Sequence, residues 1–195
     1  MKEEIQNLKV QTRRKEKINK KKTDWNWIIR ITILACMISF IFSFVSEMTI
    51  PNVNVIIGIL LVVVFILLGV LFDMIGVAVT AADEKTFHSM NARKVKGADL
   101  AVKFKKNADK VASFCNDVVG DICGIISGSA GAIIALSLSN VFHIDQFIIT
   151  LVTTSIIAAL TIGGKAIGKS YAINKSDIIL YRFTKSISYF YQVKR

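Results

Sequence analysis

Four long apolar segments alternate with short or basic segments along the chain. A helix needs about 20 apolar residues to cross the hydrocarbon core of a bilayer, and each segment approaches or exceeds that length. The third is the least apolar, because it contains acidic residues and four glycines. The pattern predicts an all-α, polytopic membrane protein with four transmembrane helices. They are expected at Trp27–Val45, Val55–Ala82, Val111–Leu138 and Phe147–Gly168.

Two further regions carry apolar residues at helical spacing among charged residues, which is typical of amphipathic helices. One is the loop 83–110, where we expect two short interfacial helices. The other is the C-terminal part, 173–195, where we expect a juxtamembrane amphipathic helix with Asn174 as its N-cap. The stripes consist of Phe87, Met90, Val95, Ala98, Ala101, Val102 and Phe104 in the loop, and of Ile178, Ile179, Phe183, Ile187 and Phe190 in the C-terminal part.

The basic residues predict the orientation of these helices. The net charge of +11 would suit a nucleic-acid partner, but all 25 lysines and arginines flank or enter the apolar segments from one side of the predicted topology. The two loops at Glu47–Asn54 and Asn140–Gln146 contain none. Because cytoplasmic loops carry the excess of lysine and arginine, we expect both termini to be cytoplasmic in a multi-pass protein of the cell (plasma) membrane. No nucleic-acid partner is expected.

Several common chemical sites are not expected. Cys36, Cys115 and Cys123 lie in apolar segments without zinc or thioredoxin-like spacing and are interpreted as small buried residues. Gly163–Ser170 (GGKAIGKS) matches the phosphate-loop pattern, but an apolar segment too long for a strand precedes it. A nucleotide site is therefore rejected, and the chain is not expected to be an enzyme.

Four ionisable residues lie inside the predicted spans: Asp73, Asp117, Asp121 and Lys165. Each costs about 2.5–3.5 kcal/mol near the bilayer centre, so a partner or a function is expected. With about 1.5 Å of rise per residue, Asp73 lies roughly 14 Å from the cytoplasmic end of its helix and Asp121 roughly 15 Å. Charges on three helices are therefore expected at a similar depth.

Two interpretations of these charges remain open. Asp117 and Asp121 are four residues apart, on one helix face, where two carboxylates repel unless a cation or proton intervenes. Together with Asp73 and Asn116 they offer hard oxygen ligands, which suit Mg²⁺. The alternative is a salt-bridged helix interface, in which Lys165 neutralises an aspartate.

From Phe72 to about Phe190 the chain resembles the membrane domain of the CNNM/CorB/CorC family. The family's motifs are F-S-x-S-E-x-A-L, an Asn-Pro-Glu-like turn, T-x-x-x-G-N-x-x-x-N and G-E-x-x-P-K-x-x-A. The corresponding segments here are FDMIGVAV (Phe72–Val79), NADK (Asn107–Lys110), NDVVGDICGI (Asn116–Ile125) and GKAIGKSYA (Gly164–Ala172). In the last segment Gly164, Lys169 and Ala172 keep the family's spacing.

The resemblance implies a Mg²⁺/Co²⁺ transporter or efflux protein. The family binds the metal through serine, asparagine and glutamate side chains. Here the motif serine falls on Asp73, the glycine-linked asparagine on Asp121, and the second asparagine on Ile125. The two glutamates fall on Gly76 and Lys165.

The resemblance also implies a domain organisation. It consists of a basic cytoplasmic tail (1–24), a leader transmembrane helix (25–46), a CorB-like membrane domain (54–172) and the juxtamembrane helix (173–195). A homodimer in the lipid bilayer is expected, without the family's CBS domains, so that regulation would need a separate protein. The expected function is a minimal divalent-cation transporter using Asp73, Asp117, Asp121 and Asn116. The alternative is a non-transporting membrane subunit or scaffold in which Lys165 neutralises the aspartates.

Overall fold

The computed structural model describes residues 25–49, 54–143 and 145–190, and every regular element in these ranges is a helix. Four helical stretches are long and apolar enough to cross a membrane, in agreement with the sequence pattern. They are α2 (Trp25–Thr49), α3 (Val55–Ala81), the stretch Ala108–Phe142 and α8 (Gln146–Asn174). The predicted basic tail, 1–24, lies outside the described residues.

The third stretch is not one regular α-helix. It consists of α6 (Ala108–Ser113), the π-helix η2 (Phe114–Gly120) and α7 (Asp121–Phe142). A π-helix is rare and is frequently found at a functional site. The hydropathy pattern predicted the span but contained no signal for this change of helix type.

Short polar side chains begin two of the long helices. The Asn54 side chain accepts a hydrogen bond from the backbone N–H of Ile56, and Asp145 accepts one from Phe147. Such caps satisfy backbone donors that have no partner within the helix. The predicted N-cap Asn174 is wrong, because α8 continues to Asn174 and the next helix starts only at Ser176.

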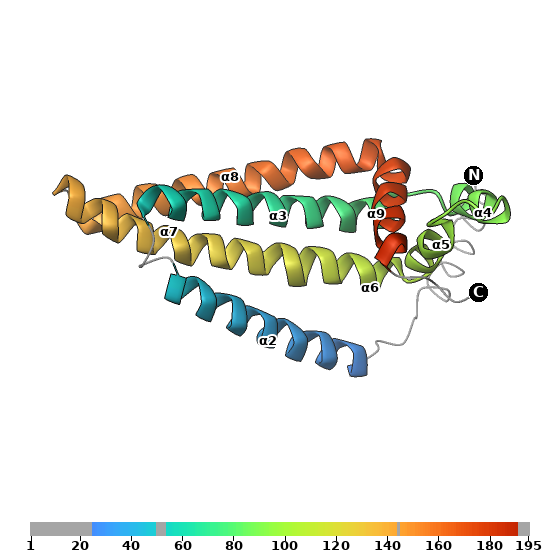
Figure 1. Cartoon of the computed structure of the whole chain (residues 1–195), viewed down its shortest axis with the longest axis horizontal. Coiled ribbons are helices and arrows are strands. Elements are labelled where there is room, and N and C mark those ends of the chain that lie inside the picture. The colour runs from blue at the N-terminus through green and yellow to red at the C-terminus, as the bar shows by residue number, and fades with distance from the viewer. Residues whose placement is uncertain (1–24, 50–53, 144, 191–195) are drawn as a thin grey trace, which may run out of the picture. The chain divides into compact units, whose positions relative to one another are not determined.

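Helices α3, α7 and α8 lie side by side over most of their length (Figure 1). Glycines allow close approach: a Cβ at Gly168 would lie 2.8 Å from Cγ of Met74, and one at Gly164 would lie 3.0 Å from Val70. Gly124 and Gly128, in contrast, have open space where a side chain would stand.

The boundary between two compact units of the chain falls within α2, between Ile33 and Leu34. The second unit contains the rest of α2 and all the other helices. In that unit, Phe42 of α2 meets Phe65 of α3 edge-on, with 6.5 Å between the ring centroids. Cys36 is exposed, contrary to the expectation that all three cysteines are buried; Cys115 and Cys123 are buried as expected.

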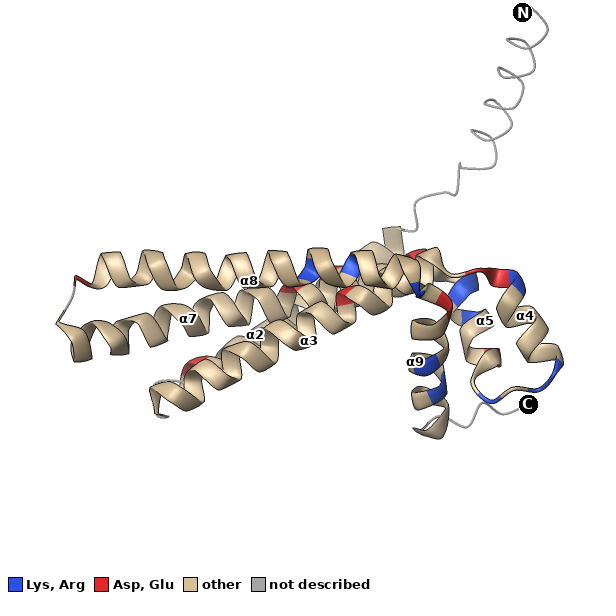
Figure 2. Ribbon diagram, turned by 90° about the horizontal axis from the view of Figure 1, so that it is seen from above, with Lys and Arg blue, Asp and Glu red and all other residues tan. Residues whose placement is uncertain are grey.

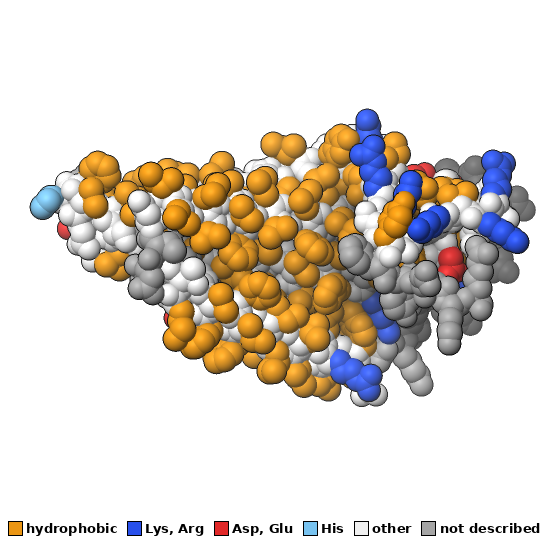
Figure 3. Space-filling view, in the orientation of Figure 1, with side chains coloured by type: hydrophobic (Ala, Val, Ile, Leu, Met, Phe, Trp, Pro, Cys, Tyr) orange, Lys and Arg blue, Asp and Glu red, His pale blue; other side chains and the backbone are white. Residues whose placement is uncertain are grey.

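Three shorter helices form a small lobe at one end of the bundle: α4 (Glu84–Ala92), α5 (Ala98–Lys106) and α9 (Ser176–Phe190). The apolar loop stripe packs into a core of its own with the end of α3 and with α9, rather than lying free. This core consists of Val79, Ala82, Phe87, Ala101, Val102 and Leu180. Figure 3 shows one face of the molecule, with apolar side chains over the long helices and Lys and Arg gathered around this lobe.

Two side chains attach the lobe to the bundle. Lys105 donates hydrogen bonds to the carbonyl oxygens of Val79 and Thr80, which belong to the last turn of α3. At the start of α9, the Asp177 carboxylate accepts a hydrogen bond from the backbone N–H of Asp83 at 2.9 Å. The lobe is therefore held to the helix that carries Asp73.

Candidate cation site

Charged residues on α3, α7 and α8 come together partway along the bundle (Figure 2). This region is the candidate site. It is formed by the second half of α3, the π-helix η2, the first turn of α7 and the second half of α8.

Asp73 is the one charged side chain that is buried among the described residues, with 3% of its surface exposed. Its Oδ2 atom lies 3.5 Å from Nζ of Lys169 on α8, and the lysine side chain is half-exposed. Within the described part of the chain, this oxygen has no hydrogen-bond partner of suitable geometry. A buried carboxylate oxygen in this state retains the capacity to accept a further donor or a cation.

Asn116 provides a second buried oxygen nearby. A Cβ added at Gly76 would overlap its amide Oδ1, so the amide occupies the space that a side chain at Gly76 would fill. Gly76 lies three residues after Asp73 on α3, which places the two positions on neighbouring turns of one face. In the described ranges, Oδ1 of Asn116 also has no hydrogen-bond donor.

The π-helix helps to explain this position. Asn116 is the third residue of η2, which packs against α3. A π turn places side chains at angles that differ from those of an α-helix, since its hydrogen bonds join residues five apart. Together, Gly76 on α3 and the π-helix η2 opposite it bring the Asn116 amide close to the α3 backbone.

Lys165 pairs with Asp121, with Nζ donating to Oδ1 at 3.0 Å. The lysine side chain is 18% exposed and the aspartate side chain 63% exposed. Nζ of Lys165 also lies beside Gly120, where an added Cβ would be in ordinary van der Waals contact with it at 3.7 Å. The aspartate that Lys165 contacts is therefore Asp121, whereas Asp73 faces Lys169.

The predicted ligands are therefore only partly brought together. Asp117 is exposed, as is Asp121. Within the described residues, no three His, Cys, Asp or Glu side chains are grouped so that they could hold a metal ion by themselves. The sequence analysis missed Lys169 as a charge partner, although its position four residues after Lys165 places both lysines on one face of α8.

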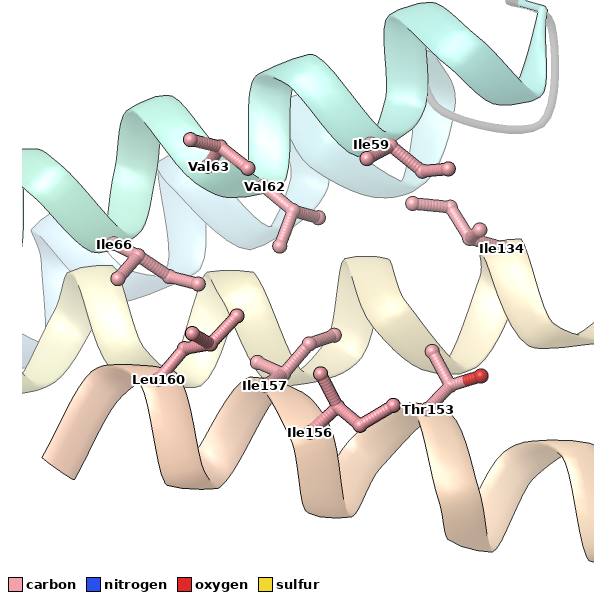
Figure 4. Close-up of a pocket in the computed structure, with 9 residues that line it drawn as sticks. All are labelled: Ile59, Val62, Val63, Ile66, Ile134, Thr153, Ile156, Ile157 and Leu160. Carbon is pink, nitrogen blue, oxygen red and sulfur yellow. The ribbon is translucent and has the colours of Figure 1, made fainter. Parts of the chain in front are cut away.

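The opposite end of the same three helices has a different lining. An apolar groove of about 180 Å³ lies between α3, α7 and α8. Figure 4 shows its aliphatic side chains, with the Thr153 hydroxyl as the polar group. This groove offers no ligand for a cation, so the candidate site is confined to the end near the lobe.

A comparison with protein-family models and with curated proteins finds no match for this chain. The resemblance to the CNNM/CorB/CorC membrane domain thus depends on the motif residues quoted for it.

Proposed function

We propose that the chain is a minimal CorB-like membrane protein that transports or exports a divalent cation, Mg²⁺ or Co²⁺. The observation that carries this proposal is the pair of buried oxygens, Asp73 Oδ2 and Asn116 Oδ1, neither of which has a hydrogen-bond donor among the described residues. Buried polar oxygens are nearly always satisfied in native proteins, so two such atoms, one on α3 and one on η2 opposite the next turn of α3, suggest a missing partner. Carboxylate and amide oxygens are ligands that Mg²⁺ accepts.

The proposal assigns different roles to the four sequence-derived ligands. Asp73 and Asn116 bind the cation, and the Lys169 ammonium is the resident counter-ion of Asp73 that an entering cation displaces. Because the Lys169 side chain is half-exposed, it has space to move away. Asp121 is held by Lys165, and Asp117 lies outside the buried pair, so neither is needed as a direct ligand in this arrangement.

The membrane arrangement is part of the same proposal. Four spans with both termini cytoplasmic, in the plasma membrane, agree with the distribution of all 25 basic residues. A homodimer is supported by the exposed Asp117 and Asp121, because carboxylates inside a span usually face protein or water rather than lipid.

The test is a divalent-cation flux assay in liposomes, paired with thermal unfolding of the purified chain in detergent. We expect Mg²⁺ or Co²⁺ flux and a metal-dependent rise in Tm, since a ligand at 100 times its Kd stabilises the folded state by about 2.7 kcal/mol. Asp73→Asn should abolish both effects. Asp117→Asn is the matched control, because it removes the same charge from a neighbouring exposed position, and it should retain them. Equal losses in the two variants would contradict the assignment of Asp73.

A second candidate function is favoured by the two ion pairs. With Lys165 on Asp121 at 3.0 Å and Lys169 near Asp73 at 3.5 Å, each of these carboxylates already has a positive partner. The chain would then be a non-transporting subunit or scaffold whose charges hold α8 to its neighbours. Wild-type protein without flux and without metal-dependent stabilisation supports this alternative over the transporter.

A further inference from the structure

Helix α9 lies crosswise at the end of the long helices, with α5 on its far side from them (Figures 1 and 2). Its buried face includes Leu180, which belongs to the core of the lobe, and Thr184. On the opposite face, exposed residues follow one another at helical spacing. This outer face consists of Ile178, Arg182, Ser186 and Tyr189. It is the face of α9 opposite Leu180 and the core that Leu180 shares with α5.

Basic and aromatic side chains gather at this face. Nζ of Lys96, from the turn before α5, lies 3.7 Å from the ring centroid of Tyr189, whose side chain is largely exposed. Lys185 on α9 holds its Nζ 5.7 Å from the centroid of the Tyr181 ring. Exposed Arg182 lies between them in the sequence of α9. The cluster thus joins two segments that are far apart in the chain.

A glycine makes this junction possible. Gly97 has φ of +89°, in the left-handed region that favours glycine. A Cβ at this position would lie 2.9 Å from Cα of Lys185, so any larger residue would separate the turn from α9. The close approach brings Lys96, the preceding residue, to the side of α9.

The charge of this face is not balanced by its own helix. Asp177 is the one acidic residue in α9, and its carboxylate accepts the hydrogen bond from the backbone N–H of Asp83. Arg182, Lys185 and Lys96 therefore form a positive surface beside an apolar residue, Ile178, and a tyrosine.

We propose that this surface, defined as Lys96, Ile178, Arg182, Lys185 and Tyr189, binds the phosphate headgroups of anionic phospholipids in the adjoining leaflet. Clusters of lysine and arginine at a membrane surface attract anionic lipid headgroups, and tyrosine rings are enriched at the membrane interface. The three basic side chains bind the headgroups. The Ile178 side chain and the Tyr189 ring enter the boundary with the acyl chains. This inference requires that the long helices cross a bilayer, but it is independent of whether the chain transports a cation.

The experiment titrates purified full-length chain in detergent with phosphatidylglycerol or with phosphatidylcholine of the same acyl chains, and measures Tm. Phosphatidylglycerol should stabilise at lower concentration than phosphatidylcholine, and added salt should reduce the difference. Each neutralised basic residue should weaken the apparent affinity about fivefold, the factor that corresponds to about 1 kcal/mol per basic residue at an anionic surface. Glycerol phosphate without acyl chains should give no stabilisation, because the apolar contacts are then missing.

The variant Lys96→Gln/Arg182→Gln/Lys185→Gln should lose the preference for phosphatidylglycerol. The matched control Lys85→Gln/Arg93→Gln/Lys106→Gln removes the same net charge from exposed positions elsewhere in the lobe and should keep it. The single variant Arg182→Gln, at an exposed side chain, provides a readout if the triple variant does not fold. Equal effects of the two triple variants, or no preference in the wild type, would overturn the proposal.

Discussion

The two ends of the α3–α7–α8 bundle use the same three helices in opposite ways. Near the lobe, glycines draw the helices together, and buried or paired polar side chains lie between them. At the other end the helices enclose an apolar groove of about 180 Å³ lined by isoleucine, valine and leucine. Lipid tails are as apolar as leucine, so a loose apolar end costs little in a bilayer. A polar group cannot find a hydrogen-bond partner among lipid tails, so the end of the bundle that carries polar groups must surround them with protein.

The glycines at the two ends of the bundle also face different kinds of neighbour. Gly76 faces an amide group that is held by η2, whereas Gly131 faces the Cδ1 atom of Ile157, a side chain that lines the apolar groove. The first neighbour is confined between helices and the second has space into which it can move. The same added methyl group is therefore expected to have unequal effects at the two ends.

The largest expected effect comes from Lys165→Met. Asp121 then loses its counter-charge within the proposed span, and the free energy of unfolding should fall by at most about 2.5–3.5 kcal/mol, the cost of an unpaired charge at the centre of a bilayer, because the Asp121 side chain is 63% exposed. The measurement is equilibrium unfolding in detergent or bicelles. The double variant Lys165→Met/Asp121→Leu should recover at least about 1 kcal/mol, as expected when both members of an ion pair are replaced by apolar residues. A single variant as stable as the wild type would show that the pair does not stabilise the bundle.

Gly76→Ala should have the next largest effect. Its methyl group overlaps the Asn116 amide oxygen, and overpacking of this kind costs about 1–3 kcal/mol. It should also weaken metal-dependent stabilisation, because Asn116 is displaced from the proposed site. Gly131→Ala is the control at the apolar end and should cost less than about 1 kcal/mol, since Ile157 can move. The comparison fails if Gly131→Ala is the more damaging of the two substitutions in the same unfolding assay.

The smallest effect is expected for Val63→Leu, because Val63 lines the apolar groove and the added methylene has space. Stability should change by less than about 0.5 kcal/mol. Val70→Leu, one and a half to two turns nearer the lobe on the same helix, should cost about 1–3 kcal/mol, because Val70 already packs against Gly164 and Gly168. Similar Tm values for the two variants would mean that the two ends are equally well packed.

The sequence alone determined the spans and the two short helices of the loop. These features follow from hydropathy and from local periodicity, which are properties of consecutive residues. The same reasoning located charges at a similar depth on three helices. Two predictions were wrong: that Asn174 caps the last helix and that Cys36 is buried. The residue at which a helix ends and the burial of a side chain both depend on what packs against them.

Only the tertiary structure decided which charges meet. Lys165 and Lys169 lie on one face of α8, but the rotation and spacing of α3 and α7 bring Asp121 to the first and Asp73 to the second. The π-helix and the space at Gly76 place the Asn116 amide beside α3. Periodicity gives the face on which a side chain lies but not the residue opposite, because the opposite residue is set by how closely two backbones approach.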